Sequence, residues 1–268
     1  MSAGQTSAAP DLKSLFDLSG RVAVITGGHG DLAEAMADGL AELGCSVVLA
    51  ARRVDACEQL AHDLEGKHGV RALAVAADVC RETDVGRVID TAIRELGRID
   101  ILINSAATFW AAPPEEVPVD RGWRRVIDVN LTGAFLACQA AGRHMLATGS
   151  GSIVNVASTG GLMSFMPSVG STLSYTTSKG ALISLTRDLA AQWSARGVRV
   201  NAIAPGSIAG GMTHTIPEEN QAVMVAQIPM GRQGRPDELR GAVAYLASDA
   251  SSYVTGAVLV VDGGQTIV

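Results

Sequence analysis

The sequence predicts a single α/β domain built on a seven-stranded, parallel, doubly wound sheet with helices on both faces. Short apolar runs rich in β-branched residues alternate with segments whose apolar residues recur at helical spacing. The apolar runs are continuous, whereas a strand with one face in water alternates apolar and polar residues. No linker, low-complexity segment or internal repeat divides the chain, and its 268 residues suit one large domain.

The expected elements follow one another as strand, helix, strand along most of the chain. The first strand is the run Arg21-Val22-Ala23-Val24-Ile25. The helix after it ends before Gly44, a residue suited to the left-handed turn that closes many helices. Short continuous apolar runs predict strands at residues 21–25, 46–50, 72–75, 101–103, 152–156, 198–203 and 258–261. Helices are expected near 31–43, 55–67, 82–96, 123–147, 174–196 and 236–247.

The composition excludes several classes of protein. The formal net charge is −6 and no basic run occurs, so nucleic acid is not an expected partner. The five histidines are isolated, so no metal is expected. No stretch approaches the ~20 apolar residues of a membrane span, and no signal-peptide pattern opens the chain. The four scattered cysteines indicate reduced thiols, which favours a cytoplasmic location without membrane contact.

Tyr175 and Lys179 lie four residues apart in a predicted helix, hence on one face and one turn apart. A tyrosine phenol has a pKa of about 10, and a neighbouring ammonium favours the phenolate and lowers that pKa. The pair can therefore exchange a proton with an alcohol oxygen. Taken alone, the spacing also fits a surface tyrosine beside a solvated lysine, so the assignment depends on the other motifs.

A glycine-rich turn joins the first strand to the first helix. Such a turn lets backbone N–H groups and the helix N-terminus approach a pyrophosphate, although an ordinary glycine turn is the alternative. The residues of this turn that are expected to bind a cofactor are Thr26, Gly27, Gly28, Gly30, Asp31 and Leu32.

With both motifs, the chain resembles the short-chain dehydrogenase/reductase family over about residues 16–264. The resemblance implies a Rossmann-type fold, a nicotinamide cofactor and an alcohol or ketone substrate. The second and third glycines of the family motif correspond here to Asp31 and Ala33, which is a departure, and Gly30 stands one place early. The Asp31 carboxylate either repels the pyrophosphate or caps the helix and points away.

The resemblance also implies the roles of four catalytic residues. Tyr175 is the acid-base group, and Lys179 lowers its pKa and holds the nicotinamide ribose. Ser158, at the end of the fifth strand, polarises the substrate oxygen. Asn130 bends the central helix and holds a proton-relay water.

The end of the second strand bears on the choice of cofactor. Family members that prefer NAD carry an acidic residue at the place of Ala51, and here Arg52 follows that alanine directly. A guanidinium can bind a 2′-phosphate, so NADP(H) is the preferred cofactor and NAD(H) is possible. A solvated basic pair at a helix start is the alternative interpretation.

By the same resemblance, Asp78 and Val79 bind the adenine, while Asn104 and Ala106 support the sheet and the adenosine ribose.

Pro205, Gly206 and Ile208 are expected at the nicotinamide. The family has a threonine at the place of Gly210, and residues near 207–228 are expected to form a mobile substrate lid.

These observations predict hydride transfer between a nicotinamide and a secondary alcohol or ketone, such as a polyol or a sugar acid of the gluconate 5-dehydrogenase type. A 3-oxoacyl thioester reductase is one alternative, and a non-catalytic dinucleotide sensor is another. Residues 1–14 are expected to form a flexible arm before a single domain at 15–268, and the domain is expected to assemble as a homotetramer.

Overall fold

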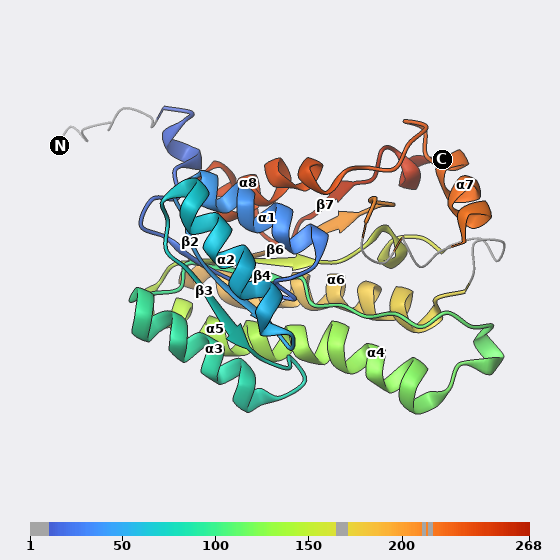
Figure 1. Ribbon diagram of the computed structural model, residues 1–268, viewed down its shortest axis with the longest axis horizontal. Coiled ribbons are helices and arrows are strands. Elements are labelled where there is room, and N and C mark those ends of the chain that lie inside the picture. The colour runs from blue at the N-terminus through green and yellow to red at the C-terminus, as the bar shows by residue number, and fades with distance from the viewer. Residues whose placement is uncertain (1–10, 165–170, 211–212, 214–216) are drawn as a thin grey trace, which may run out of the picture.

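The computed structural model describes residues 11–164, 171–210, 213 and 217–268. Its centre is a seven-stranded sheet in the order β3-β2-β1-β4-β5-β6-β7, and every neighbouring pair is parallel (Figure 1). This confirms the predicted fold class. The strands are β1 (Val22–Thr26), β2 (Ser46–Ala51), β3 (Ala72–Ala76), β4 (Ile101–Asn104), β5 (Gly151–Val156), β6 (Val198–Pro205) and β7 (Val258–Val261).

Two helical layers cover the sheet because alternate residues of its central strands face opposite sides. Ala23 and Ile25 belong to one apolar core, and Val22 and Val24 belong to the other. The first core includes residues of α1 (Asp31–Glu42), α2 (Val54–His68) and α8 (Arg240–Ala247). The second includes residues of α3 (Glu82–Leu96), α5 (Gly133–Thr148) and α6 (Leu173–Trp193).

The strand order reverses between β1 and β4. From β1 the chain moves outward through β2 to β3, and from β4 it moves outward in the other direction. The crevice beyond the carboxyl ends of the strands at such a reversal is where doubly wound sheets bind their ligands. The glycine turn after β1 and the residues after β4, β5 and β6 therefore meet there.

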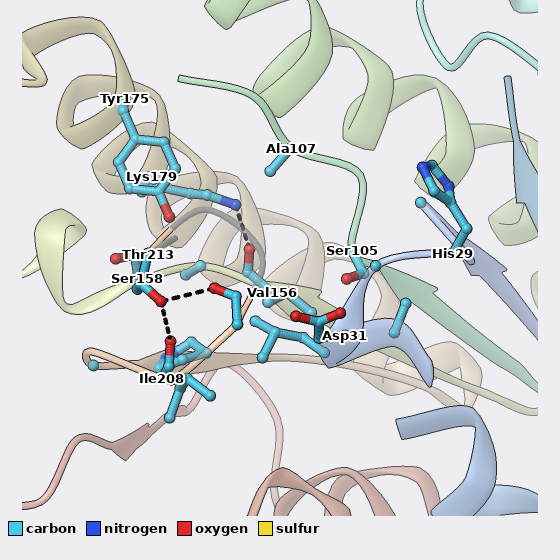
Figure 2. A pocket seen from close by; sticks show the side chains of 18 residues that line it. His29, Asp31, Ser105, Ala107, Val156, Ser158, Tyr175, Lys179, Ile208 and Thr213 are labelled. Atoms are coloured by element: carbon cyan, nitrogen blue, oxygen red, sulfur yellow. Dashed lines mark hydrogen bonds between the residues drawn. The ribbon is translucent and has the colours of Figure 1, made fainter. Parts of the chain in front are cut away.

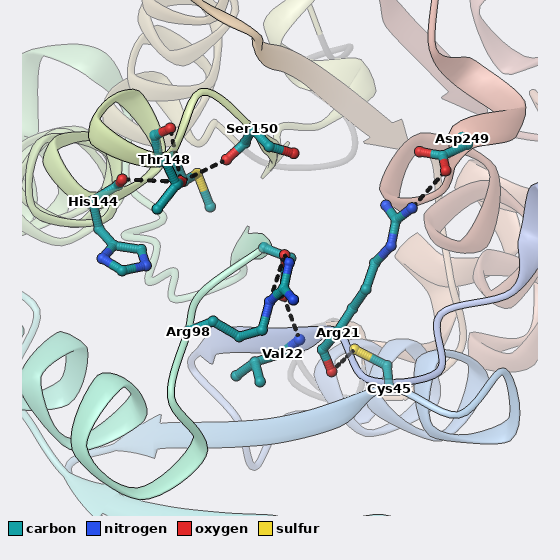
Figure 3. Close-up of polar contacts among 10 residues, drawn as sticks. Arg21, Val22, Cys45, Arg98, His144, Thr148, Ser150 and Asp249 are labelled. Atoms are coloured by element: carbon teal, nitrogen blue, oxygen red, sulfur yellow. Dashed lines mark hydrogen bonds and ion pairs between the residues drawn. The ribbon is translucent and has the colours of Figure 1, made fainter.

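Polar contacts hold the opposite end of the sheet, where the strands begin (Figure 3). The Asp100 carboxylate accepts a hydrogen bond of 2.9 Å from the Val22 N–H and bonds of 2.8 Å and 2.6 Å from the Arg98 guanidinium. Arg21 pairs with Asp249 at 2.6 Å. These contacts fix the starts of β1 and β4, so the two strands present their carboxyl ends in register.

The predicted helix at 123–147 is confirmed but is not uniform. It begins with a π-helical segment at Val119–Arg124, continues through α4 (Arg125–Ile127), and widens again at Asp128–Thr132 before α5. Wide turns of this kind are rare and often mark functional sites. Asn130 lies in the second one, and the bend expected at this residue stays a prediction.

Two segments carry expectations about flexibility. Residues 11–14 belong to the expected flexible arm, and there the Asp11 carboxylate accepts hydrogen bonds from the N–H groups of Lys13 and Ser14, next to a short 3₁₀ turn at Ser14–Phe16. Residues 1–10 lie outside the described part. In the expected lid, α7 (Glu218–Ala226) forms a helix, while residues 211–212 and 214–216 are not described. Whether the lid moves stays a prediction.

All four cysteines are free thiols, as expected. Within the described residues, no helix combines the length and the apolar character needed to cross a bilayer. The same residues contain no group of three or more histidine, cysteine or acidic side chains placed to hold a metal ion.

Candidate active site

A cavity of about 290 Å³ lies beyond the carboxyl ends of β1, β4, β5 and β6 (Figure 2). It brings together residues that are far apart in the sequence. The residues predicted for the site that line it are Gly27, Gly30, Asp31, Leu32, Ser158, Tyr175, Lys179, Pro205, Gly206 and Ile208.

A second cavity of about 110 Å³ extends the first over the ends of β2 and β3. The two share Gly27, His29 and Ala107 in their walls, so together they form one elongated cleft. The predicted residues in the second cavity are Gly27, Arg52, Asp78, Val79 and Ala106.

Helix α6 holds Tyr175 and Lys179 one turn apart, as predicted. The Lys179 ammonium nitrogen lies 5.6 Å from the centre of the Tyr175 ring. Lys179 is only 2% exposed, and its nitrogen donates a hydrogen bond of 2.6 Å to the carbonyl of Val156 at the end of β5. The sheet therefore fixes the lysine against the tyrosine, and a surface pair is excluded.

Burial controls the titration of both groups. It lowers the pKa of Lys179 to about 8, because the ammonium has lost most of its hydration. It raises the pKa of Tyr175, and a hydrogen bond with Ser158 acts in the opposite direction. The pKa of Tyr175 is therefore raised in this structure by burial, and the lowering expected from Lys179 stays a prediction.

Ser158 is well placed for the predicted role. It follows β5 directly and is buried, and its hydroxyl oxygen accepts a 3.0 Å hydrogen bond from the N–H of Gly160. This bond fixes the side chain and leaves the hydroxyl proton available. Ser158 and Tyr175 line the same cavity, as contact of both with one substrate oxygen would require.

Asn130 is almost completely buried and organises the site from behind. Its side-chain oxygen accepts from the Thr108 N–H at 2.8 Å, and its amide donates to the Thr108 carbonyl and the Ser178 hydroxyl, both at 2.9 Å. Ser178 in turn donates to the carbonyl of Tyr175 at 2.7 Å. The side chain thus ties the segment after β4 to helix α6, and its role toward a relay water stays a prediction.

Three predicted cofactor residues do not line the cleft. Thr26 accepts a hydrogen bond from the Ala106 N–H at 3.4 Å, and Gly28 packs against Leu49. Asn104 donates to the side chain of Asn155 at 2.9 Å, in the interior of the sheet. All three lie behind the cleft walls and contact other parts of the protein, because the turn and the strand ends direct them away from the cleft.

The glycine turn lies very close to the segment that follows β4. Gly27 has a φ of +70°, and a Cβ there would stand 2.7 Å from the Cα of Ala106, so only glycine fits. The first turn of α1 follows with Asp31, Leu32 and Ala33 in the cavity wall. Its N–H groups have no partner within the helix and are oriented to receive an anion.

Asp31 itself does not form a helix cap. The N-cap residue is Gly30, and no side-chain cap bond is present. The Asp31 carboxylate lies in the cavity beside Gly210, in the loop after β6 (Figure 2). The capping alternative for this residue is therefore excluded by the geometry.

Sequence reasoning missed two side chains that line the second cavity of the cleft. His29 has a buried Nδ1 without a partner among the described residues, and burial followed by the charges of Arg53 and Arg52 lowers its pKa. Arg125 lines the second cavity from α4 and contacts the sulfur of Cys80 at 3.6 Å. His29 lies inside the glycine motif and could have been found there, whereas Arg125 reaches the cleft only through folding.

The loop after β6 contributes Pro205, Gly206 and Ile208 to the cavity wall, as predicted. The hydroxyl of Thr213, three residues beyond Gly210, donates to the carbonyls of Gly210 at 2.7 Å and Ile208 at 3.1 Å. The hydroxyl thus stabilises its own loop, while Thr213 also lines the cavity, and whether it takes the place of the family's threonine stays a prediction.

The chain has relatives of known activity. A family model described as enoyl-(acyl carrier protein) reductase matches residues 29–266. A cis-4-hydroxycyclohexanecarboxylate dehydrogenase of Sinomonas cyclohexanicum is 41% identical over 249 residues, which cover 92% of this chain and 97% of the relative. A D-threitol dehydrogenase of Mycolicibacterium smegmatis is 37% identical over 94% of this chain and 95% of its own length.

Solved structures agree in fold. A gluconate 5-dehydrogenase from Burkholderia cenocepacia in complex with NADP and tartrate superposes with a TM-score of 0.90 at 33% identity, covering 96% of this chain and 100% of that one. A xylitol dehydrogenase bound to NAD⁺ gives a TM-score of 0.87 at 33% identity, covering 92% and 99%. A Rossmann-type oxidoreductase is the class that these matches share. The chain belongs to the short-chain dehydrogenase/reductase family.

The residues of the cleft fit a dinucleotide, with one exception. The close approach at Gly27, the open N-terminus of α1 and the unpartnered His29 nitrogen all suit a ligand that carries phosphates. The exception is the carboxylate of Asp31, which is an anion at the place where the pyrophosphate is expected.

Proposed function

We propose that the protein is an NADP(H)-preferring dehydrogenase/reductase of secondary alcohols and ketones. The observation that carries the proposal is the meeting of Ser158, Tyr175 and Lys179 in one cavity, which the glycine turn borders. These side chains come from β5 and α6 and supply a hydroxyl, a phenol and an ammonium, the groups that proton exchange with an alcohol oxygen needs.

The bound nicotinamide supplies the hydride chemistry, and the protein supplies orientation and proton transfer. When a ketone is reduced, Tyr175 donates its phenolic proton to the carbonyl oxygen, and it takes that proton back when the alcohol is oxidised. Ser158 donates a hydrogen bond to the same oxygen and polarises it. The positive charge of Lys179 stabilises the phenolate that remains on Tyr175.

The cavity walls favour an uncharged, hydroxyl-bearing substrate. Val156, Ala157 and Ile208 give the cavity an apolar side, and Lys179 is the only lysine or arginine among its described lining residues. A substrate carboxylate would meet Asp31 in the same cavity. A polyol or cyclic alcohol is therefore the proposed substrate class, in line with the D-threitol and xylitol dehydrogenases among the similar proteins, whereas the hydroxycyclohexanecarboxylate and gluconate dehydrogenases are named for substrates that carry a carboxylate.

The proposed preference for NADP(H) is supported by Ala51 and Arg52. Ala51 ends β2 at the wall of the second cavity and leaves no carboxylate there for the ribose hydroxyls. Arg52 lines that cavity with an exposed side chain, and His29 lies in the same wall. The Arg52 guanidinium can bind a 2′-phosphate, which NAD(H) lacks, and the His29 ring can add a hydrogen bond.

We further propose a homotetramer in the cytoplasm. The surface carries apolar side chains that an assembly would cover. Val119, Trp123 and Phe135 are exposed along the 119–148 helix, and Tyr253, Ile267 and Val268 are exposed near the C-terminus. Two separate apolar regions allow two different two-fold contacts, which is what a tetramer with three two-fold axes requires.

The proposed function is tested by screening purified protein against polyols, cyclic alcohols, the matching ketones and 3-oxoacyl thioesters, with both nicotinamide couples. Turnover is followed by the absorbance of the reduced cofactor. Turnover of an alcohol or ketone supports the proposal, and turnover of thioesters alone would assign the thioester reductase activity instead. Cofactor binding without any turnover would leave the sensor function.

A further inference from the structure

Asp31 brings a negative charge into the cavity where the reaction takes place. Its side chain lines the same cavity as Ser158, Tyr175 and Lys179 (Figure 2). Among the described residues, its carboxylate has no hydrogen-bond or ion-pair partner. The charge is therefore available to whatever occupies the cavity.

The absence of a side chain at Gly210 leaves space for this carboxylate. An ideal Cβ at position 210 would collide with Oδ2 of Asp31 and would stand 3.0 Å from its Cγ. Gly210 also has a φ of +104°, a conformation that favours glycine. The Asp31 carboxylate thus occupies the volume that a side chain at 210 would fill, against the loop that carries Ile208.

The proposed reaction places a group of changing charge in this cavity. An oxidised nicotinamide ring is a cation, and the reduced ring is neutral. The ring must approach the carbon whose oxygen contacts Ser158 and Tyr175, so it occupies the same cavity as Asp31. The pyrophosphate, in contrast, carries the same charge in both redox states.

We propose that Asp31 determines the specificity of the site for the redox state of the cofactor. Its carboxylate strengthens binding of the oxidised, cationic nicotinamide relative to the reduced form. The inference rests on the proposed function. The carboxylate attracts the ring only in the oxidised form, whereas it repels the pyrophosphate equally in both forms. The ratio of the two dissociation constants therefore isolates its effect on the ring.

The test is calorimetric titration of NADP⁺ and NADPH into wild type and Asp31→Asn, which removes the charge and keeps the shape. We expect the ratio of the NADP⁺ to the NADPH dissociation constant to rise about fivefold in the variant, equivalent to about 1 kcal/mol. Glu34→Gln is the matched control. Glu34 lies in the same first turn of α1 but is exposed and does not line the cavity, so this change should leave the ratio unaltered.

An unchanged ratio in Asp31→Asn, with both constants lowered together, would overturn the proposal and would mean that the carboxylate acts on the pyrophosphate alone. An equal change in Glu34→Gln would also overturn it, because the effect would then come from the helix. If wild type bound neither the NADP nor the NAD couple, the proposed function itself would fail, and this would be known before any variant is compared.

Discussion

The ammonium nitrogen of Lys179 lies 5.6 Å from the centre of the Tyr175 ring, while its hydrogen bond goes to the sheet and not to the phenol. The two side chains are therefore neighbours without a direct hydrogen bond between them. Both groups are desolvated, which raises the pKa of Tyr175 and lowers that of Lys179. Buried contacts hold both side chains in place. Little side-chain conformational entropy is therefore lost when the site reacts.

Replacement of Tyr175 by phenylalanine should abolish most of the activity. The ring keeps its packing, and only the proton donor is lost, so we expect kcat to fall by at least ~100-fold with cofactor affinity almost unchanged. Steady-state assays and cofactor titration measure the two effects. Tyr253→Phe is the matched control, because Tyr253 is fully exposed and far along the chain from the cavity. Near-normal turnover in Tyr175→Phe would refute the assignment.

Lys179→Met should stabilise the protein at neutral pH. Burial lowers the lysine pKa to about 8 from 10.5, so between these values the unfolded chain binds more protons than the folded one. The burial of this charge therefore lowers the free energy of unfolding by its full amount below pH 8, and this destabilisation disappears as the pH rises toward 10.5. The variant should gain up to about 3 kcal/mol in the free energy of unfolding at pH 7.

Urea unfolding of wild type and Lys179→Met at pH 7, 8.5 and 10 measures this gain, which should shrink steadily as the pH rises. Lys67→Met is the control, because Lys67 is exposed and pairs with Asp38 at the surface. A variant that is less stable than wild type at pH 7, or a gain that is independent of pH, would show that the ammonium is not penalised by burial.

The sequence predicted the fold and the pairing of Tyr175 with Lys179 because both depend on local patterns. Continuous apolar runs mark buried parallel strands, and Tyr175 and Lys179 are neighbours on one helix whatever the rest of the chain does. What could not be predicted depends on long-range packing. The Lys179 bond to Val156 requires β5 beside α6, and Arg125 reaches the cleft only once α4 is placed.

Two further features, the π-helical turn around Asn130 and helix α7, were also not predicted from the sequence. The π-helical turn at Asp128–Thr132 carries no sequence pattern that distinguishes it from an ordinary helical turn. Helix α7 is short and has only a weak periodic pattern, although Pro217 and the acidic residue after it are signals of a helix start.

Arg52→Ala should weaken NADPH binding and leave NADH binding almost unchanged. A guanidinium–phosphate bond is a charge-assisted contact, so about a tenfold rise in the NADPH dissociation constant is expected. Arg53→Ala is the control, since Arg53 is exposed next to Arg52 and does not line the second cavity. Equal losses for NADPH and NADH, or the same loss in Arg53→Ala, would contradict the proposed role of Arg52.

Phe135→Glu should weaken the proposed assembly. Phe135 is exposed on α5, and a buried carboxylate in an apolar interface without a partner is unfavourable. Light scattering at micromolar concentration should give a tetramer for wild type and smaller species for the variant. Leu12→Glu, which changes an exposed residue near the N-terminus, should leave the mass unchanged. A monomeric wild type would exclude the tetramer.

Asp31 and Gly210 should be energetically coupled. Gly210→Ala introduces a Cβ that collides with the Asp31 carboxylate and also strains the backbone at a φ of +104°. In an Asp31→Gly background the collision is absent, whereas the backbone strain is the same. Comparison of the two single variants, the double variant and wild type therefore cancels the strain and leaves the contact. We expect the loss of unfolding free energy caused by Gly210→Ala to be smaller by about 1 kcal/mol when Asp31 is glycine. Thermal and urea unfolding of the four proteins measure it, and effects that add within about 0.5 kcal/mol would show that the two residues do not compete for one volume.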